Sequence, residues 1–105
     1  MTQEQLEAIM GLIMNSGNAK SNAMEAIQAA KKNDFELAKT KLAEADEALV
    51  EAHHAQTGLL TKEAQGDQMT VTLLAVHSQD HLMTSITFND LAKEVVDIYQ
   101  RLADE

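Results

Sequence analysis

The sequence predicts an all-α protein, an antiparallel three-helix bundle, and three observations support that fold class. Alanine, leucine, glutamate, glutamine, lysine and methionine dominate the 105 residues, and these are strong helix formers. Proline is absent, and glycine occurs only four times. Apolar residues recur at steps of three and four, which is the period of an amphipathic helix. A chain of this length is expected to form one domain, residues 1–105.

The first helix is expected over residues 2–31. Thr2 and Gln5 match a capping box, in which a hydroxyl and an amide satisfy backbone groups at the start of a helix. Lys31 and Lys32 suit the negative end of the helix dipole, so the helix is expected to end there. The predicted apolar stripe consists of Leu6, Ile9, Met10, Ile13, Gly17, Met24 and Ile27.

The second helix is expected over residues 34–65. Asn33 or Asp34 suits its N-cap, and Gly66 suits a left-handed residue just after its end. Acidic and basic residues occupy its other faces, as is typical of a helix with one buried side. Its predicted seam, at alternating steps of three and four, is Phe35, Ala38, Leu42, Ala45, Leu49, Ala52, Gln56 and Leu59.

The third helix is expected over residues 68–102 and has apolar residues on more than one face. A helix that is apolar all round needs partners on all sides, and exposed patches of that size invite aggregation. We therefore predict a homo-oligomer built around this helix. The seam predicted for it is Thr84, Phe88, Leu91, Val95, Ile98 and Leu102.

Composition and charge argue against several classes of function. Seventeen acidic residues against eight basic ones give a net charge of −9, whereas nucleic-acid binding needs clusters of lysine and arginine. The absence of cysteine removes disulfides, thiolate metal sites and cysteine nucleophiles. No apolar run approaches the ~20 residues of a membrane span. Met1 to Glu7 lacks the basic-then-apolar order of a secretory signal, so we expect a soluble, cytoplasmic protein without direct membrane insertion.

A polar patch interrupts the third helix at His77, Asp80, His81 and Thr84, which share one helical face. Burying such groups without partners costs about 1–3 kcal/mol each, so a compensating role is expected. Spacing alone leaves three interpretations open. The side chains are solvated or paired within the bundle, the histidines share a transition metal, or one histidine is a nucleophile for a phosphoryl group. In the last case the second histidine and the hydroxyls of Thr84 or Ser85 would hold the phosphoryl oxygens.

Three stretches share a resemblance to one known family. They are HSQDHLMTS at residues 77–85, EAHHAQTGLL at residues 51–60 followed by Glu63-Ala64, and the junction Asn33-Asp34-Phe35. These stretches resemble the lactose/cellobiose-type enzyme IIA proteins of the bacterial phosphoenolpyruvate-dependent sugar phosphotransferase system (PTS), and the likeness spans essentially the whole chain. Ser78 departs from the glycine, and Ser85 from the threonine, expected in that family.

The resemblance implies a homotrimeric phosphocarrier, a component of the phosphotransferase system and not a stand-alone enzyme. Phospho-HPr would phosphorylate His77, and the phosphoryl group would pass to a cysteine of the cognate IIB component for sugar uptake. His81 and Gln79 would then stabilise the phosphoryl group. Asp80, one from each subunit, would meet at the threefold axis around a structural divalent metal, Mg²⁺.

The residues leave a second class of function open. A non-catalytic helical interaction protein, with or without a linking metal, would also use histidines on a helix face, for packing or regulation. His53 and His54 occupy adjacent positions about 100° apart, so at least one of them is expected to face solvent. A place for either histidine beside the site is a further possibility that the spacing leaves open.

Overall fold

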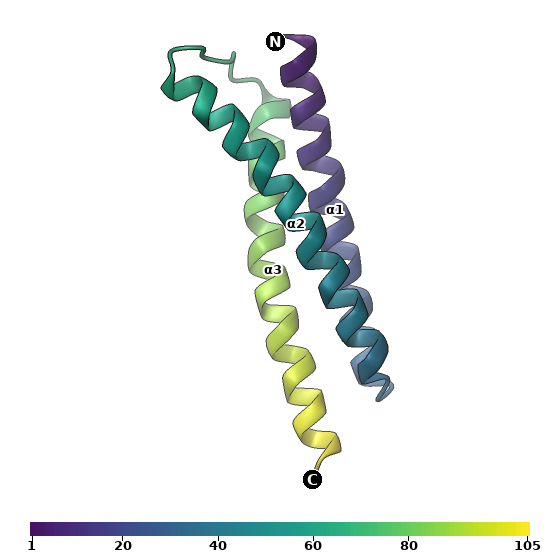
Figure 1. The fold of residues 1–105 in the computed structure, drawn as a ribbon. Coiled ribbons are helices and arrows are strands. Elements are labelled where there is room, and N and C mark those ends of the chain that lie inside the picture. Colours follow the sequence, from purple (N-terminus) through teal and green to yellow (C-terminus); the bar gives the residue numbers. More distant parts are fainter.

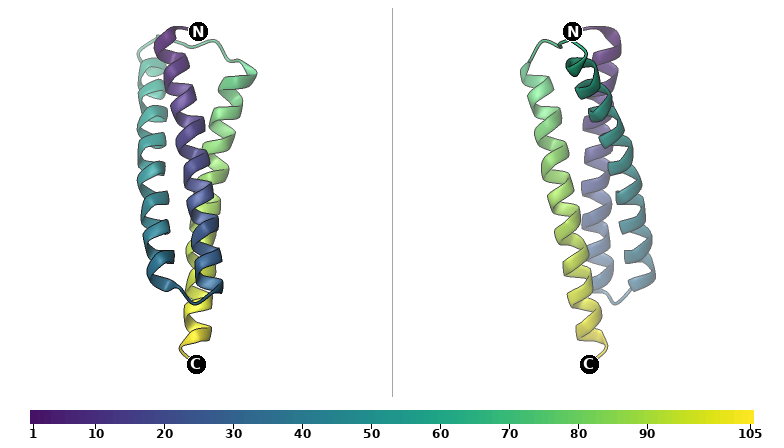
Figure 2. Two further views of the ribbon diagram at one scale, coloured as in Figure 1. Left: turned by 90° about the vertical axis from the view of Figure 1, so that its right-hand side faces the viewer. Right: turned by 60° about the vertical axis from the view of Figure 1, so that its left-hand side comes forward.

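The computed structural model describes residues 1–105 as three long antiparallel α-helices, which in the view of Figure 1 run down, up and down. α1 spans Gln3–Lys31, α2 spans Phe35–Ala64 and α3 spans Leu73–Ala103. The bundle is a rod with extents of 56 × 19 × 19 Å, and the two termini lie at opposite ends. α1 packs against both other helices, whereas α2 and α3 contact each other less extensively (Figure 2). The all-α class is confirmed, and no helix has the length and hydropathy of a membrane span.

The capping box at the start of α1 is confirmed. The Thr2 hydroxyl accepts a hydrogen bond from the backbone N–H of Gln5 at 3.1 Å. In return, Oε1 of Gln5 accepts one from the backbone N–H of Thr2 at 3.0 Å. Two donors that the first turn of the helix leaves free are thus satisfied by side chains.

One short turn both ends α1 and starts α2. Asn33 adopts a left-handed φ of 61°, which asparagine tolerates better than most residues. The amide of Asp34 donates to the carbonyl of Ala29 at 2.9 Å, which closes the end of α1. The Asp34 side chain then accepts from the N–H of Leu37 at 3.2 Å. Asp34, and not Asn33, is therefore the N-cap of α2.

The predicted start of α3 at residue 68 is wrong, because α3 begins at Leu73. Gly66 has φ 94° and ends α2 as predicted, with the amide of Asp67 bonded to the carbonyl of Lys62 at 2.9 Å. The next residues include the β-branched run Thr70-Val71-Thr72, which favours extended backbone. The Thr72 hydroxyl accepts from the N–H of Ala75 at 3.1 Å and caps the helix there.

The core is narrow and made mostly of alanine. Ile9, Leu12 and Leu82 are the only large apolar side chains with no exposed surface. The seam predicted for α2 is confirmed, with Ala38, Ala45 and Ala52 buried and its other members half-buried. The stripe predicted for α1 is largely wrong, because only Ile9 of its seven members is buried. The buried residues of α1 are instead Gln5, Ile9, Leu12, Ser16, Ala19, Ala23, Ala26, Ala29 and Ala30.

The seam predicted for α3 is largely wrong as an internal seam, because four of its six members are exposed and only Phe88 and Val95 are half-buried, with Phe88 packed against the core. Leu91, Ile98 and Leu102 are 59, 55 and 59 % exposed. Smaller residues, three of them polar, turn inward instead, and two of the polar ones donate to groups on the other helices. The Asn89 amide, for example, donates to the Asp46 carboxylate of α2 at 2.8 Å. The buried residues of α3 are Ala75, Ser78, Leu82, Ser85, Asn89, Ala92 and Val96.

Candidate functional site

The two histidines of α3 form a stacked pair. His77 and His81 are one turn apart, and their rings lie 5.7 Å from centroid to centroid with 9° between the ring planes. His77 is exposed, whereas His81 is half-buried against α1. An incoming partner can therefore reach His77 directly. Any group bound to His77 would have a second imidazole close by.

The His81 ring packs against α1. A Cβ atom built on Gly17 would lie 3.5 Å from Nε2 of His81, so the ring rests against the backbone of α1. Lys20, one turn further along α1, donates from Nζ to the Thr84 hydroxyl at 3.1 Å. Burial is the main cause that lowers the pKa of His81, with the charges of Lys20 and His77 adding to it and Asp80 opposing it. The neutral imidazole is thus favoured, which offers one donor and one acceptor nitrogen.

The two hydroxyls near the histidines are occupied by other partners. Ser85 is buried and donates to the backbone carbonyl of Ser16 on α1 at 3.0 Å. The Thr84 hydroxyl donates to the carbonyl oxygens of Asp80 and His81 at 3.0 and 3.2 Å. The Ser85 hydroxyl joins α3 to α1 in this structure, and the prediction that it holds a phosphoryl oxygen gains no support from this contact.

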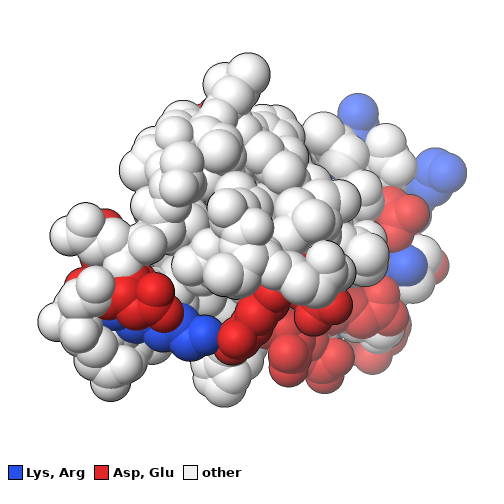
Figure 3. Space-filling view, turned by 90° about the horizontal axis from the view of Figure 1, so that it is seen from above, with Lys and Arg blue, Asp and Glu red and all other residues white.

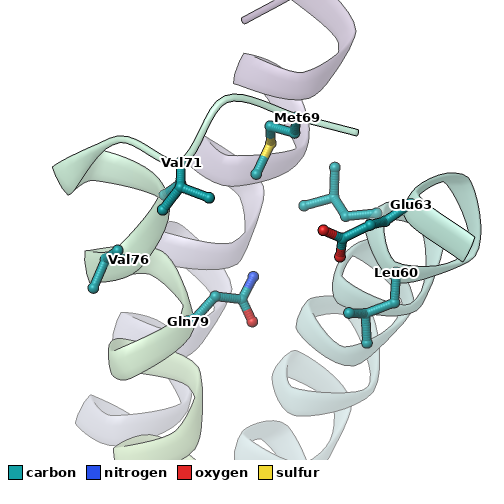
Figure 4. Close-up of a pocket in the computed structure, with 8 residues that line it drawn as sticks. Leu60, Glu63, Met69, Val71, Val76 and Gln79 are labelled. Atoms are coloured by element: carbon teal, nitrogen blue, oxygen red, sulfur yellow. The ribbon is translucent and has the colours of Figure 1, made fainter. Parts of the chain in front are cut away.

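Gln79 lies on the other side of α3 from the histidine pair. Its Oε1 accepts a hydrogen bond from the side-chain amide of Gln56 on α2 at 2.6 Å. Figure 4 shows Gln79 pointing into the space between α3 and the end of α2, below the connection that contains Met69 and Val71. Leu60 and Glu63 of α2 line the same pocket. A single chain therefore does not bring Gln79 together with His77.

Asp80 is exposed and has no hydrogen bond or ion pair through its carboxylate. It projects from the outer face of α3, on the side away from the buried residues Ser78 and Leu82. No group of three or more metal-ligating side chains occurs within one chain. The shared transition-metal interpretation of His77 and His81 therefore gains no third ligand from the fold.

His53 and His54 do not join the histidine pair. Both are exposed on α2. His54 lines a shallow pocket with residues of α1 and α2, among them Glu4 and Lys62, which form an ion pair at 2.6 Å.

Acidic side chains collect on one side of the bundle. Figure 3 views the molecule from above, the end that carries the N-terminus, and shows the acidic side chains on one side of this view with uncharged atoms over most of the rest. The acidic residues Glu44, Glu47 and Glu51 of α2 line a hollow with Asn18 and Asn22 of α1.

Two residues of this site were missed in the sequence. Gly17 and Lys20 share a face of α1, but only the packing of α1 on α3 brings them beside His81. Their spacing of three residues was a visible signal of a common face. It carried no information about which residues of another helix that face would meet.

The comparison with known proteins points to one family. A sequence model described as "PTS system, Lactose/Cellobiose specific IIA subunit" matches residues 7–100. The cellobiose-specific EIIA component of the PTS from Lactococcus lactis is 52% identical over 101 residues, which cover 96% of this chain and 87% of that protein.

Solved structures agree with this match. The cellobiose-specific enzyme IIA of the PTS from Bacillus anthracis superimposes with a TM-score of 0.95 and 44% identity, covering 100% of this chain and 95% of that chain. A chain from the solution structures of the IIA(chitobiose)–HPr complex of Escherichia coli superimposes with a TM-score of 0.83 and 41% identity. That match covers 97% of this chain and 99% of the other.

Proposed function

The chain belongs to the lactose/cellobiose-specific IIA family of the PTS and is a phosphocarrier component of that system, and from this premise we propose that His77 carries the phosphoryl group. The observation that supports His77 is its exposed ring stacked on a half-buried second imidazole. No other histidine of the chain has such a neighbour. The phosphoryl donor is phospho-HPr, since a relative is known in complex with HPr.

The chemistry needs little beyond position and charge. A ring nitrogen of His77, Nε2 in our proposal, attacks the phosphorus in line as the N–P bond of phospho-HPr breaks. The freed imidazole is the leaving group, so the phosphoryl group moves from one histidine to another. His81 donates one N–H to a phosphoryl oxygen. In the next step a cysteine thiolate of the cognate IIB component takes the phosphoryl group, and the whole relay runs in the cytoplasm.

Phosphoryl labelling tests this role. The protein is incubated with phosphoenolpyruvate, enzyme I and HPr, and phosphate that is labile in acid and stable in base is measured. His77→Ala should abolish the label, whereas His53→Ala, at an exposed histidine of α2, should leave it unchanged. Persistent label in His77→Ala would contradict the assignment of His77. Absence of label in the wild-type protein would favour the alternative, a non-catalytic interaction protein.

We also propose that three copies assemble through the outer face of α3. Leu91, Ile98 and Leu102 form an exposed apolar stripe there, and a soluble chain of this size seldom leaves such a stripe uncovered. In a parallel arrangement of three α3 helices, the exposed Asp80 carboxylates would approach one another on the same face. The repulsion between them needs protonation or a cation.

Asp80 fits a divalent metal at that point. Its carboxylate is free of other partners, and carboxylate oxygens suit Mg²⁺. Three copies of Asp80, one from each subunit, would hold the ion, which would offset their charge and tie assembly to their ionisation. Gln79 lies about 160° from His77 around α3, so in this assembly we propose that it serves the site of a neighbouring subunit.

A further inference from the structure

Lys20 is the one basic side chain whose position no ion pair or helix end explains. Four of the eight basic residues form ion pairs with carboxylates: Lys41, Lys62, Lys93 and Arg101. Three unpaired lysines are exposed at or near the turn between α1 and α2: Lys31, Lys32 and Lys39. Lys20 is also unpaired, yet it is half-buried at the middle of α1.

A hydroxyl, and not a carboxylate, holds the Lys20 ammonium. Its Nζ donates to Oγ1 of Thr84 at 3.1 Å. The hydroxyl proton of Thr84 is directed to carbonyl oxygens of α3, so the oxygen is left to accept from Lys20. An ammonium group has three donors, and this contact uses one of them. Two N–H groups and the whole positive charge therefore remain available to a ligand.

The charge of Lys20 faces the histidine pair. Lys20, Gly17 and His81 line one open hollow between α1 and α3. Gly17 has no side chain that could separate the lysine from the ring. Its backbone lies so close to the ring that a Cβ atom built there would be 3.5 Å from Nε2 of His81. The His81 ring in turn stacks on that of His77. A cation thus lies on the same edge of the bundle as the exposed imidazole.

We propose that Lys20 is a phosphoryl-binding residue that offsets the charge of the group carried on His77; this rests on the proposed function of His77. A phosphoryl group adds about two negative charges at neutral pH. The chain already carries a net charge of −9, so a cation at the site favours the phosphorylated state. Lys20 donates one of its two free N–H groups to a phosphoryl oxygen. It keeps its proton throughout, and the N–P bonds form and break as described above.

The test compares two neutralised lysines. Lys20→Met and Lys39→Met remove the same charge and the same kind of side chain, one beside the histidines and one near the α1–α2 turn. The equilibrium constant for phosphoryl transfer from phospho-HPr is measured for each, together with thermal unfolding. Lys20→Met should lower the constant about tenfold, the lower end of what a charge-assisted hydrogen bond contributes. Lys39→Met should stay within about twofold of wild type. Lys39 lies near the start of α2, at the end of the bundle away from the start of α3 and His77, so solvent and salt screen its charge from the phosphoryl group.

Two further variants separate charge from packing. Lys20→Arg restores the charge and should bring the constant back to within about threefold of wild type, while Lys20→Gln should behave like Lys20→Met. Equal constants for Lys20→Met and Lys39→Met would overturn the inference. A Lys20→Arg protein as weak as Lys20→Met would do the same. Wild-type protein that takes no label at all would overturn the proposed function of His77, which is a separate result.

Discussion

Leu91 offers the sharpest test of assembly through α3. It is 59 % exposed in the single chain, so it adds little to the stability of one bundle. Full burial of a leucine side chain is worth about 2 kcal/mol. Covering the exposed part of Leu91 is then worth about 1 kcal/mol per subunit and about 3 kcal/mol per trimer, which is about a hundredfold in the association constant. Leu91→Ala should weaken the trimer by that factor.

Sedimentation equilibrium over a range of concentrations measures the change. Leu37→Ala is the matched control. Leu37 is 43 % exposed, and it lies on α2 and not on the face of α3 that we propose as the subunit contact. The control should leave the association constant unchanged. If Leu91→Ala and Leu37→Ala sediment alike, the apolar stripe of α3 is not the subunit contact and our reasoning fails.

Three other predictions follow from the core, the axis and the histidine pair. Leu82→Ala should cost about 3 kcal/mol of unfolding free energy in urea, because Leu82 is fully buried between Leu12 and Ala52; a loss below about 1 kcal/mol would contradict that packing. Removal of divalent metal with EDTA should weaken the wild-type trimer but not that of Asp80→Leu, and equal sensitivity of the two would argue against Asp80 as the ligand. Since the folded-state pKa of His81 lies below its ordinary value of 6.5, the unfolded chain binds more protons near that pH, and the folded state should lose stability as the pH falls through 6.5. Urea midpoints should therefore drop more steeply on acidification in the wild type than in His81→Gln.

Local signals in the sequence predicted the ends of the helices well where capping residues set them. Thr2 and Gln5 form their capping box, and Gly66 adopts its left-handed conformation at the end of α2. These features depend on residues within one turn of each other. The late start of α3 was missed because Thr72 is as good a cap as residues earlier in the same polar stretch.

The inward faces of α1 and α3 were predicted poorly for a physical reason. Hydrophobicity alone selected Leu91 and Ile98 for the interior of α3, but the bundle buries Ser85 and Asn89 there. Small residues allow the helices to approach closely, and the Ser85 hydroxyl and the Asn89 amide N–H find acceptors on α1 and α2, whereas Oδ1 of Asn89 has no partner. The large apolar residues then remain outside, where they are available to other copies of the chain.

The sequence by itself determined the helical class, the histidine pair and the family, since each depends on residue types at short spacings or on an ordered match along the chain. His77 and His81 one turn apart on a helix must share a face. Only the tertiary structure decided what surrounds them. It placed Gly17 and Lys20 of α1 beside His81 and turned Gln79 towards Gln56 of α2. Those neighbours come from residues 23 to 64 positions apart, and their meeting depends on the rotation of each helix in the bundle.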